Sequence, residues 1–287
     1  MLRGPRAVTA LLAWRDLPTE LDGVALSHRA RAGKTPVLMV HGVGPGTTGR
    51  TNFAPLFDRL SPRLALHLID LAGFGASGCK AAPPYFDVIF WLRQIERAID
   101  DIIRLYRCPP ILIGNSVGGA LALKTAAARP ELTQVLAIGA AVAPPAPPAL
   151  RAFWRAPRDA GALAEAMAPM TAGRTRPDPA LVHERLAVFA DADYAVYFDT
   201  MLADPDACLR AVALTPAEAG RLGPRVALMH GREDRACPVD LTLNALLPQM
   251  PQADVILLGD CGHNVIAERT SEVLSAITRL VEKNERQ

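Results

Sequence analysis

The chain has 287 residues, 50% of them hydrophobic and 21% charged, so it can bury the core of one large α/β domain with an insertion, or of two small domains. Lys and Arg number 31 against 29 Asp and Glu, and a net charge this near zero argues against nucleic acid as the main partner. The five cysteines are scattered without a Cys-x-x-Cys pair, so they predict neither a disulfide framework nor a zinc site.

The first apolar stretch, from Ala7 to Trp14, is too short to span a membrane, and acidic residues follow it closely. No longer uninterrupted apolar run occurs. We therefore expect a soluble, cytoplasmic protein whose partner is a small-molecule substrate, without a membrane or a nucleic acid. The sequence leaves the oligomeric state open, a homo-oligomer included.

Short apolar runs alternate with helical stretches along the chain, which predicts a mostly parallel sheet flanked by helices. Nearly unbroken apolar strands are expected where helices cover both faces of a sheet. The expected strands are Val37–Val40, Ala65–Ile69, Ile111–Ile113, Val135–Ile138, Val226–Met229 and Val255–Leu258. Helical periodicity and helix-stop signals predict helices at Phe86–Tyr106, Val117–Ala128 and Ser271–Glu282.

One region breaks this alternation. A proline-rich stretch from Pro144 to Pro148 is followed by Ala-rich helical segments up to about Leu222, with no convincing strand. We interpret residues 144–222 as an inserted helical cap, with the proline-rich stretch as its entry hinge. Residues 1–143 and 223–287 then form the core domain.

The sharpest chemical signal is Gly114-Asn115-Ser116-Val117-Gly118, which matches G-x-S-x-G between an apolar strand and a helix. Such a turn strains the serine backbone and raises its hydroxyl above the sheet, at a helix N-terminus that favours negative charge. Side chains at the two glycines would clash with the neighbouring strand and helix. The alternative is an ordinary Gly-containing turn, but the context favours Ser116 as the nucleophile of an α/β-hydrolase fold.

A serine hydroxyl is a weak nucleophile until a base removes its proton. Among the six histidines, His263 follows the last expected strand and completes the chain order Ser, Asp, His of this fold. His41 and His230 precede glycines at strand ends and are expected to shape loops. Asp234 is the predicted acid that orients His263, with Glu233 as the alternative.

The loop His41-Gly42-Val43-Gly44-Pro45-Gly46 directly follows the first expected strand. It lacks the Lys-Ser/Thr ending of a P-loop and the spacing of a dinucleotide-binding loop. In an α/β-hydrolase fold it would supply one half of an oxyanion hole, which we assign to the N–H of Val43, and the N–H of Val117 would supply the other. No cluster of metal-ligating residues is visible in the sequence, so we expect the chemistry to need no cofactor.

Three features together resemble the meta-cleavage product hydrolases. They are Gly-x-Gly-Pro-Gly after the first His-Gly, Asn before the serine, and His-Gly-Arg-Glu-Asp-Arg around the acid. The resemblance extends from about Val37 to the C-terminal helix and is weak in the cap. It implies hydrolysis of a C–C bond in a 2-hydroxy-6-oxo-dienoate formed by aromatic ring cleavage. Ketonisation of the dienol would come first, and serine attack would then release a dienoic acid and a carboxylic acid.

The same resemblance implies which residues bind the substrate. They are Gly42 and Gly44 of the glycine loop, Asn52 after that loop, Asn115 before the nucleophile, and Arg185 as the cap arginine that binds the substrate carboxylate. Asn264 stands where the family usually has a tryptophan after the histidine, which changes the pocket wall beside the base.

Two other functions remain open. A carboxylesterase or thioesterase would use the same triad, without ketonisation and without an arginine for a carboxylate. A non-catalytic receptor or scaffold would keep the fold, although an intact triad argues against it. Haloalkane dehalogenases and epoxide hydrolases are disfavoured because both use an aspartate nucleophile where Ser116 stands.

Overall fold

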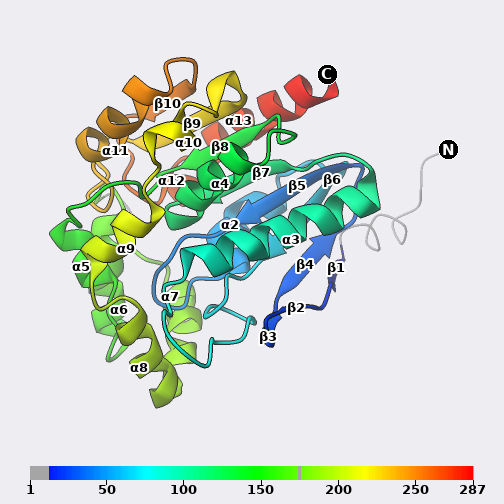
Figure 1. Ribbon diagram of the computed structural model, residues 1–287. Coiled ribbons are helices and arrows are strands. Elements are labelled where there is room, and N and C mark those ends of the chain that lie inside the picture. The colour runs from blue at the N-terminus through cyan, green and yellow to red at the C-terminus, as the bar shows by residue number, and fades with distance from the viewer. Residues whose placement is uncertain (1–12, 174–175, 287) are drawn as a thin grey trace.

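The computed structural model describes residues 13–173 and 176–286 and contains an eight-stranded sheet with the order β1-β4-β6-β5-β7-β8-β9-β10 (Figure 1). The first two strands of this order pair antiparallel with their neighbours, and the other six run parallel. The strands are β1 (Trp14–Asp16), β4 (His28–Arg31), β5 (Thr35–Val40), β6 (Leu64–Ile69), β7 (Ile111–Asn115), β8 (Val135–Ile138), β9 (Val226–Gly231) and β10 (Asp254–Leu258). A separate hairpin joins β2 (Thr19–Leu21) to β3 (Val24–Leu26).

The expected fold class is confirmed, and all six expected strands are present as β5 to β10. The four strands before β5 were not predicted, because each has only three or four residues and only β3 (Val-Ala-Leu) is apolar throughout. β10 also differs from expectation, since Val255 and Leu257 are 41% and 43% exposed. Val255 and Leu257 are two residues apart and lie on the same face of this edge strand, so that face is not covered as the faces of the central strands are. Residues 7–12 of the first apolar stretch lie outside the described residues.

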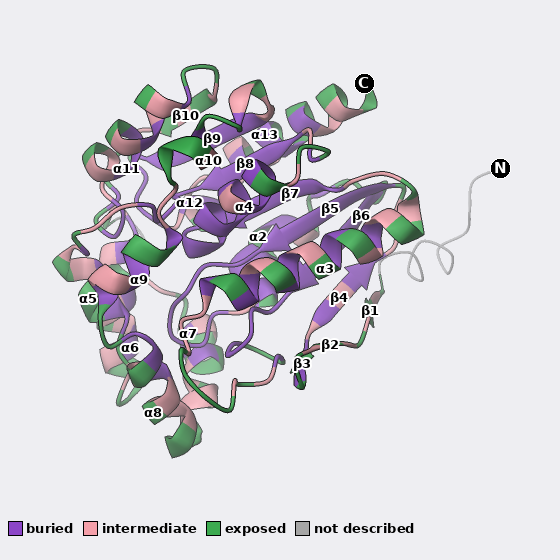
Figure 2. Cartoon of the chain, in the orientation of Figure 1, coloured by how far each residue is buried: buried purple, intermediate pink, exposed green. Residues whose placement is uncertain are grey.

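Helices cover both faces of the sheet and form two hydrophobic clusters (Figure 2). One face packs against α3 (Val88–Tyr106), α4 (Val117–Ala128) and α11 (Val239–Leu246). The other face packs against α2 (Gly49–Phe57), α12 (Val265–Glu268) and α13 (Thr270–Glu285). Among the described residues, no helix is both long and apolar enough to cross a membrane.

The helix α3 illustrates how the sequence sets these boundaries. Asp87 caps its N-terminus by accepting a hydrogen bond from the Phe90 N–H at 3.0 Å. Arg107 ends it in the left-handed conformation, with φ of 60°. Ile95, Ile99 and other members of the apolar stripe are buried against the sheet, as the periodicity predicted.

The described residues between β8 and β9 contain helices but no strand. The α-helices are α5 (Pro148–Phe153), α6 (Ala160–Met167), α7 (Pro179–Leu186), α8 (Ala192–Met201), α9 (Pro205–Val212) and α10 (Pro216–Ala219). Short 3-10 turns lie at Ala168–Met170, Ala187–Ala190 and Gly223–Arg225, and another follows α11 at Leu247–Gln249. Figure 1 shows α5, α6 and α8 stacked outside the sheet.

The order of the strands brings two distant loops together. From β5 the chain goes first to β6 on one side and later to β7 on the other side, so the order in which the parallel strands are added reverses between β5 and β7. Val40 at the end of β5 pairs in register with Gly114 near the end of β7. Loops that follow neighbouring parallel strands at such a point enclose a crevice, which is where ligands bind in open α/β sheets.

We predict that shortening Ile99 to alanine destabilises the protein by about 2–5 kcal/mol, because this side chain has no solvent exposure and its loss leaves a cavity. Leu105→Ala on the same helix is the matched control, since Leu105 is 64% exposed and should change stability by less than about 0.5 kcal/mol. Urea denaturation followed by circular dichroism measures both. Equal losses would contradict the assigned packing face of α3.

Candidate active site

Ser116 lies at the sharp turn between β7 and α4, with φ of 55° and ψ of −121°. Residues other than glycine rarely adopt this backbone conformation, and surrounding contacts hold Ser116 in it. The Ser116 N–H donates to the carbonyl of Ile138 at 2.8 Å. A Cβ on Gly114 would overlap the Gly118 carbonyl, and one on Gly118 would overlap the Val40 carbonyl, so both glycines of the motif are required by close backbone contacts.

Three side chains from separate loops form a continuous hydrogen-bonded chain. His263 Nε2 lies 3.0 Å from Ser116 Oγ, and His263 Nδ1 lies 2.7 Å from Asp234 Oδ2. All three side chains are buried. The geometry is that of a nucleophile, a base and an orienting acid within hydrogen-bond reach of each other.

Asp234 is surrounded by donors. Its Oδ1 accepts hydrogen bonds from the N–H groups of Ala236 and Cys237, at 2.9 and 2.7 Å. Its Oδ2 lies 3.1 Å from His230 Nε2 as well as beside His263. Burial by itself would raise the pKa of Asp234, but the charge of His263 and the hydrogen bonds from both histidines hold that pKa well below its usual range.

The carboxylate of Asp234 has the opposite effect on His263. Burial alone would lower the pKa of this imidazole, yet the adjacent carboxylate stabilises the imidazolium and raises the pKa well above its usual value. Glu233, the alternative acid, is engaged elsewhere, because its Oε2 accepts from the Cys261 N–H at 2.9 Å. Burial also raises the pKa of the Cys261 thiol to about 12, which favours a space-filling role for that side chain.

His230 contributes more than the loop-shaping role that its position before glycine suggested. Its Nε2 lies 2.7 Å from the Cys237 carbonyl, so it bridges the two ends of the loop that carries Asp234. The sequence signal for this role was weak, because a histidine before a glycine is common. The contact forms only because the loop after β9 folds back to bring the Cys237 carbonyl to His230.

The backbone after β5 is held close to Ser116. Gly42 has no room for a side chain, since a Cβ there would lie 2.9 Å from the Ser116 Cβ. The Gly42 N–H donates to Asn52 Oδ1 at 3.0 Å, and His41 Nδ1 lies 2.7 Å from the Gly42 carbonyl. His41 Nε2 accepts from the Leu71 N–H at 2.9 Å, so the proton is on Nδ1 and that atom donates.

The N–H groups of Val43 and Val117 are the two candidate oxyanion donors. The N–H of Val117 belongs to the first turn of α4, where no intrahelical acceptor exists. In the described part of the chain, no hydrogen bond of the Val43 N–H is found. His41 fixes the peptide to which this N–H belongs, because it binds the Gly42 carbonyl of the same peptide group.

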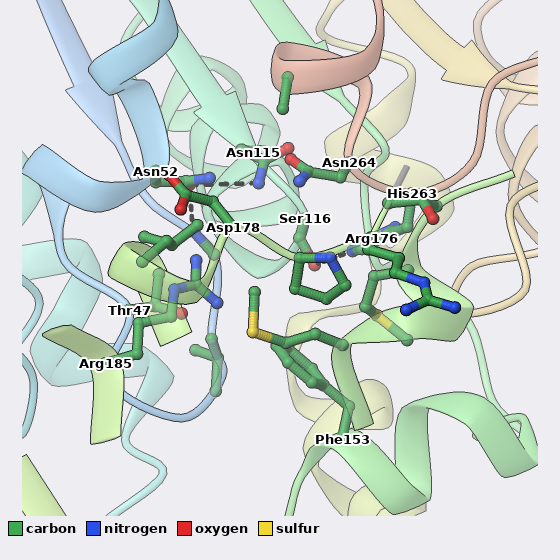
Figure 3. Close-up of a pocket in the computed structure, with 18 residues that line it drawn as sticks. Thr47, Asn52, Asn115, Ser116, Phe153, Arg176, Asp178, Arg185, His263 and Asn264 are labelled. Carbon is green, nitrogen blue, oxygen red and sulfur yellow. Dashed lines mark hydrogen bonds between the residues drawn. The ribbon is translucent and has the colours of Figure 1, made fainter. Parts of the chain in front are cut away.

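Ser116 opens into a cavity that encloses about 970 Å³ of empty space, counting the solvent at its mouth. Figure 3 shows Ser116 near its centre, with Arg185 and Thr47 on one side and His263 and Arg176 on the other. The lining residues are Gly42, Val43, Thr47, Asn52, Asn115, Ser116, Phe153, Met167, Met170, Thr171, Arg176, Pro177, Asp178, Leu181, Arg185, His263, Asn264 and Ala267. The mixture of apolar walls with a few polar groups suits a small organic ligand.

Arg185 is the buried cation of this cavity. It lies in the last turn of α7, and burial lowers the pKa of its guanidinium to about 10, so it remains charged at neutral pH. Its Nε has no hydrogen-bond partner among the described residues. A buried guanidinium whose Nε–H has no acceptor is costly, so this position favours binding of an anion.

Two asparagines form a fixed pair on the wall above Ser116 (Figure 3). Asn115 Nδ2 donates to Asn52 Oδ1 at 3.1 Å, and the same oxygen accepts from Gly42. Because Asn52 Oδ1 is occupied twice, the Nδ2 group of Asn52 is left to donate elsewhere. This arrangement joins the expected substrate-binding asparagines to the glycine loop.

Most of the predicted site residues line this cavity, and three of them do not. Gly44 is not among the lining residues, because the ring of Phe153 lies where its side chain would be. Asp234 and Val117 lie behind His263 and Ser116 and do not line the cavity. The sequence did not predict the cavity walls made by Thr47, in the loop after β5, and by Phe153 and other residues of the helices between β8 and β9, since no motif marks them.

Comparison with known proteins decides the family. The family model described as Alpha/beta hydrolase family matches residues 37–276. The chain belongs to the alpha/beta hydrolase family. Within the described residues, no group of three or more His, Cys, Asp or Glu is placed to hold a metal ion.

Similar proteins in this family carry hydrolase names, and the chain is an enzyme of the hydrolase class. It is 25% identical over 256 residues to a 2-hydroxymuconate semialdehyde hydrolase from Pseudomonas sp. (strain CF600), covering 84% of this chain and 85% of that protein. It is 27% identical over 247 residues to a 2-hydroxy-6-oxo-2,4-heptadienoate hydrolase from Pseudomonas putida, covering 84% and 87%. A solved meta-cleavage product hydrolase from Pseudomonas fluorescens IP01 shares the fold with a TM-score of 0.82 and 22% identity, covering 91% and 96%.

We predict that Asp234→Asn moves the acid limb of the pH–rate profile of this hydrolase to lower pH. The amide cannot stabilise the imidazolium, so the pKa of His263 falls and the base stays unprotonated at more acidic pH. The maximal rate should fall about 10⁴-fold, because the imidazole loses its orientation. The profile of kcat/KM on a neutral aryl ester reports the free enzyme without titration of the substrate. A limb that moves to higher pH would contradict the assignment.

Proposed function

We propose that this protein is a serine hydrolase that cleaves the C–C bond of a 2-hydroxy-6-oxo-dienoate without a cofactor. Ser116 is the nucleophile, His263 the base and Asp234 the acid that orients it. The N–H groups of Val43 and Val117 bind the oxyanion. Arg185 binds the carboxylate of the substrate, and Asn52 and Asn115 hold the oxygens next to it, while Gly42 and Gly44 allow the loop to approach.

The buried guanidinium of Arg185 is the observation that carries this proposal. A hydrolase for neutral esters gains nothing from an arginine in the wall of its cavity, and the burial of a guanidinium with an unsatisfied Nε–H destabilises the protein. A substrate carboxylate would remove that cost on binding. The names of the two curated relatives are consistent with such a substrate, since each describes hydrolysis of a muconate-type or dienoate-type acid.

The reaction follows from the positions of these groups. Ketonisation first moves the proton of the 2-hydroxyl to C5, which turns the dienol into a ketone that can accept electrons. His263 then removes the proton of Ser116 Oγ, which lies 3.0 Å away, as the oxygen attacks the C6 carbonyl carbon. The developing oxyanion lies at the two backbone N–H groups, and each such donor contributes about 3–4 kcal/mol to the transition state.

Collapse of the tetrahedral intermediate breaks the C5–C6 bond. Its electron pair is delocalised through the conjugated chain to the 2-oxo oxygen, which receives the proton held by His263 and leaves as the dienoic acid. The acyl group stays on Ser116. Water then attacks this ester while His263 accepts its proton, and the carboxylic acid product and free Ser116 are formed.

We also propose that residues 144–222 act as a cap on a core formed by residues 1–143 and 223–287. Arg185, Phe153, Met167, Met170 and Leu181 come from this segment and line the cavity above Ser116. The core would then carry the bond-breaking groups, and the cap would choose the substrate. This division explains why motifs identify the triad but not the substrate.

Arg185→Ala should lower kcat/KM for a 2-hydroxy-6-oxo-dienoate about 100-fold, which corresponds to about 3 kcal/mol for a desolvated charge pair. The activity on a short-chain p-nitrophenyl ester should change less than about threefold, because this ester has no carboxylate. Arg185→Lys, which keeps the charge, is the matched control and should retain part of the activity. If the alanine variant cleaves the dienoate normally, the carboxylate site is wrongly assigned.

A paired assay separates the C–C hydrolase from its alternatives. We expect the wild type to prefer the dienoate to the p-nitrophenyl ester, and Ser116→Ala to lose both activities by at least about 10⁴-fold. A strong preference for the ester would instead favour a carboxylesterase or thioesterase. A fluorophosphonate that fails to label Ser116 in the folded wild type would favour a non-catalytic binding protein.

A further inference from the structure

Three consecutive peptide groups after β5 are each held by a different side chain. The His41–Gly42 peptide donates its N–H to Asn52, and the Gly42–Val43 peptide accepts at its carbonyl from His41. The Val43–Gly44 peptide accepts at its carbonyl from the indole Nε1–H of Trp154, at 2.9 Å. The middle peptide carries the N–H of Val43, so contacts on both sides determine where this N–H points.

The third of these contacts has a different origin from the other two. His41 and Asn52 lie in the loop after β5 and in α2, close to Val43 in the chain. Trp154 follows α5 in the inserted helices, 111 residues after Val43, and its side chain has no solvent exposure. Beside it, the ring of Phe153 lies against Gly44.

We propose that Trp154 is a positioning residue through which the inserted helices hold the oxyanion loop in its active geometry. This inference rests on the proposed role of the Val43 N–H as an oxyanion donor. Trp154 does not line the cavity, so its effect on catalysis would act through the backbone of Val43 and Gly44.

The physical reason is the cost of a buried carbonyl without a donor. If the indole N–H is removed, the Val43 carbonyl loses its partner in a region that water does not reach, and the Val43–Gly44 peptide gains by rotating toward another donor. Rotation there changes ψ of Val43 and moves the adjoining N–H relative to Ser116. A shift of about 1 Å in a catalytic group can cost about 100-fold in rate.

The far end of the same loop is also in contact with the inserted helices. A Cβ on Gly46 would overlap the backbone carbonyl of Arg185, so the loop and α7 are packed backbone against backbone. One loop therefore connects the proposed carboxylate site at Arg185 with the proposed oxyanion donor at Val43. The inserted helices would influence both substrate binding and the rate of bond cleavage.

The test compares two tryptophans. Trp154→Phe removes the N–H and keeps an aromatic ring. Trp91→Phe is the matched control, because Trp91 is also buried and also donates its Nε1–H to a backbone carbonyl, that of Ala72, at 3.0 Å. Neither Trp91 nor Ala72 lines the cavity. Both variants are assayed for kcat and KM on a p-nitrophenyl ester and for Tm.

We expect the two variants to lose similar amounts of thermal stability, while only Trp154→Phe loses kcat, by about 10- to 100-fold with KM nearly unchanged. Affinity for an aryl trifluoromethyl ketone, which forms a tetrahedral oxyanion on the serine, should fall by a similar factor. A Trp154→Phe enzyme with wild-type kcat, or equal kcat losses in both variants, would overturn the inference.

If Trp154→Phe does not fold, the sulfur isostere of tryptophan, β-(3-benzothienyl)alanine, replaces only the N–H at position 154 and keeps the shape of the ring. The same loss of kcat supports the inference, and an unchanged kcat refutes it. Wild-type enzyme that neither hydrolyses the ester nor reacts with a fluorophosphonate would refute the proposed function instead, so the two failures are distinguishable.

Discussion

The strained backbone of Ser116 is the constraint on which the rest of the site depends. A serine with φ of 55° is unfavourable in isolation, and here it is held by the end of β7, by the start of α4 and by the Ile138 carbonyl. This conformation directs Oγ toward His263 and leaves the Val117 N–H at the N-terminus of α4. It also brings Ser116 so close to Gly42 that the neighbouring loop cannot carry a side chain there.

The order of the strands in the sheet brings the other groups of the site to the strained serine. β5 and β7 are neighbours, so the loop after β5 and the nucleophile after β7 meet at one end of the sheet. Asp234 after β9 and His263 after β10 reach the same region from the strands further along. Each chemical group thus follows a strand, and the rigidity of the parallel sheet holds distances that flexible loops alone would not maintain.

Charge is distributed unevenly across this site. Asp234 and His263 form a buried pair in which each stabilises the charged form of the other. The Nε of Arg185 has no hydrogen-bond partner among the described residues, and its guanidinium faces the cavity (Figure 3). The charges of Asp234 and His263 therefore balance each other within the protein, whereas we propose that the guanidinium of Arg185 is balanced by a bound anion. This contrast is the physical basis of our proposal that the core carries catalysis and the inserted helices select the substrate.

The sequence by itself determined the central strands, the fold class and the identity of the three hydrogen-bonded residues. Those signals are local: largely apolar runs of three to five residues, a serine between glycines after a strand, and an acid and a histidine after later strands. It did not reveal the antiparallel strands before β5, the exposed edge of β10, or the bridging contact of His230. Only the tertiary structure decided that Asn52 binds Gly42, that Arg185 is buried in the wall of the cavity that Ser116 lines, and that Trp154 donates to Val43. Contacts such as that of Trp154 join residues more than a hundred positions apart, and their formation depends on how the inserted helices pack on the core, which no short pattern encodes.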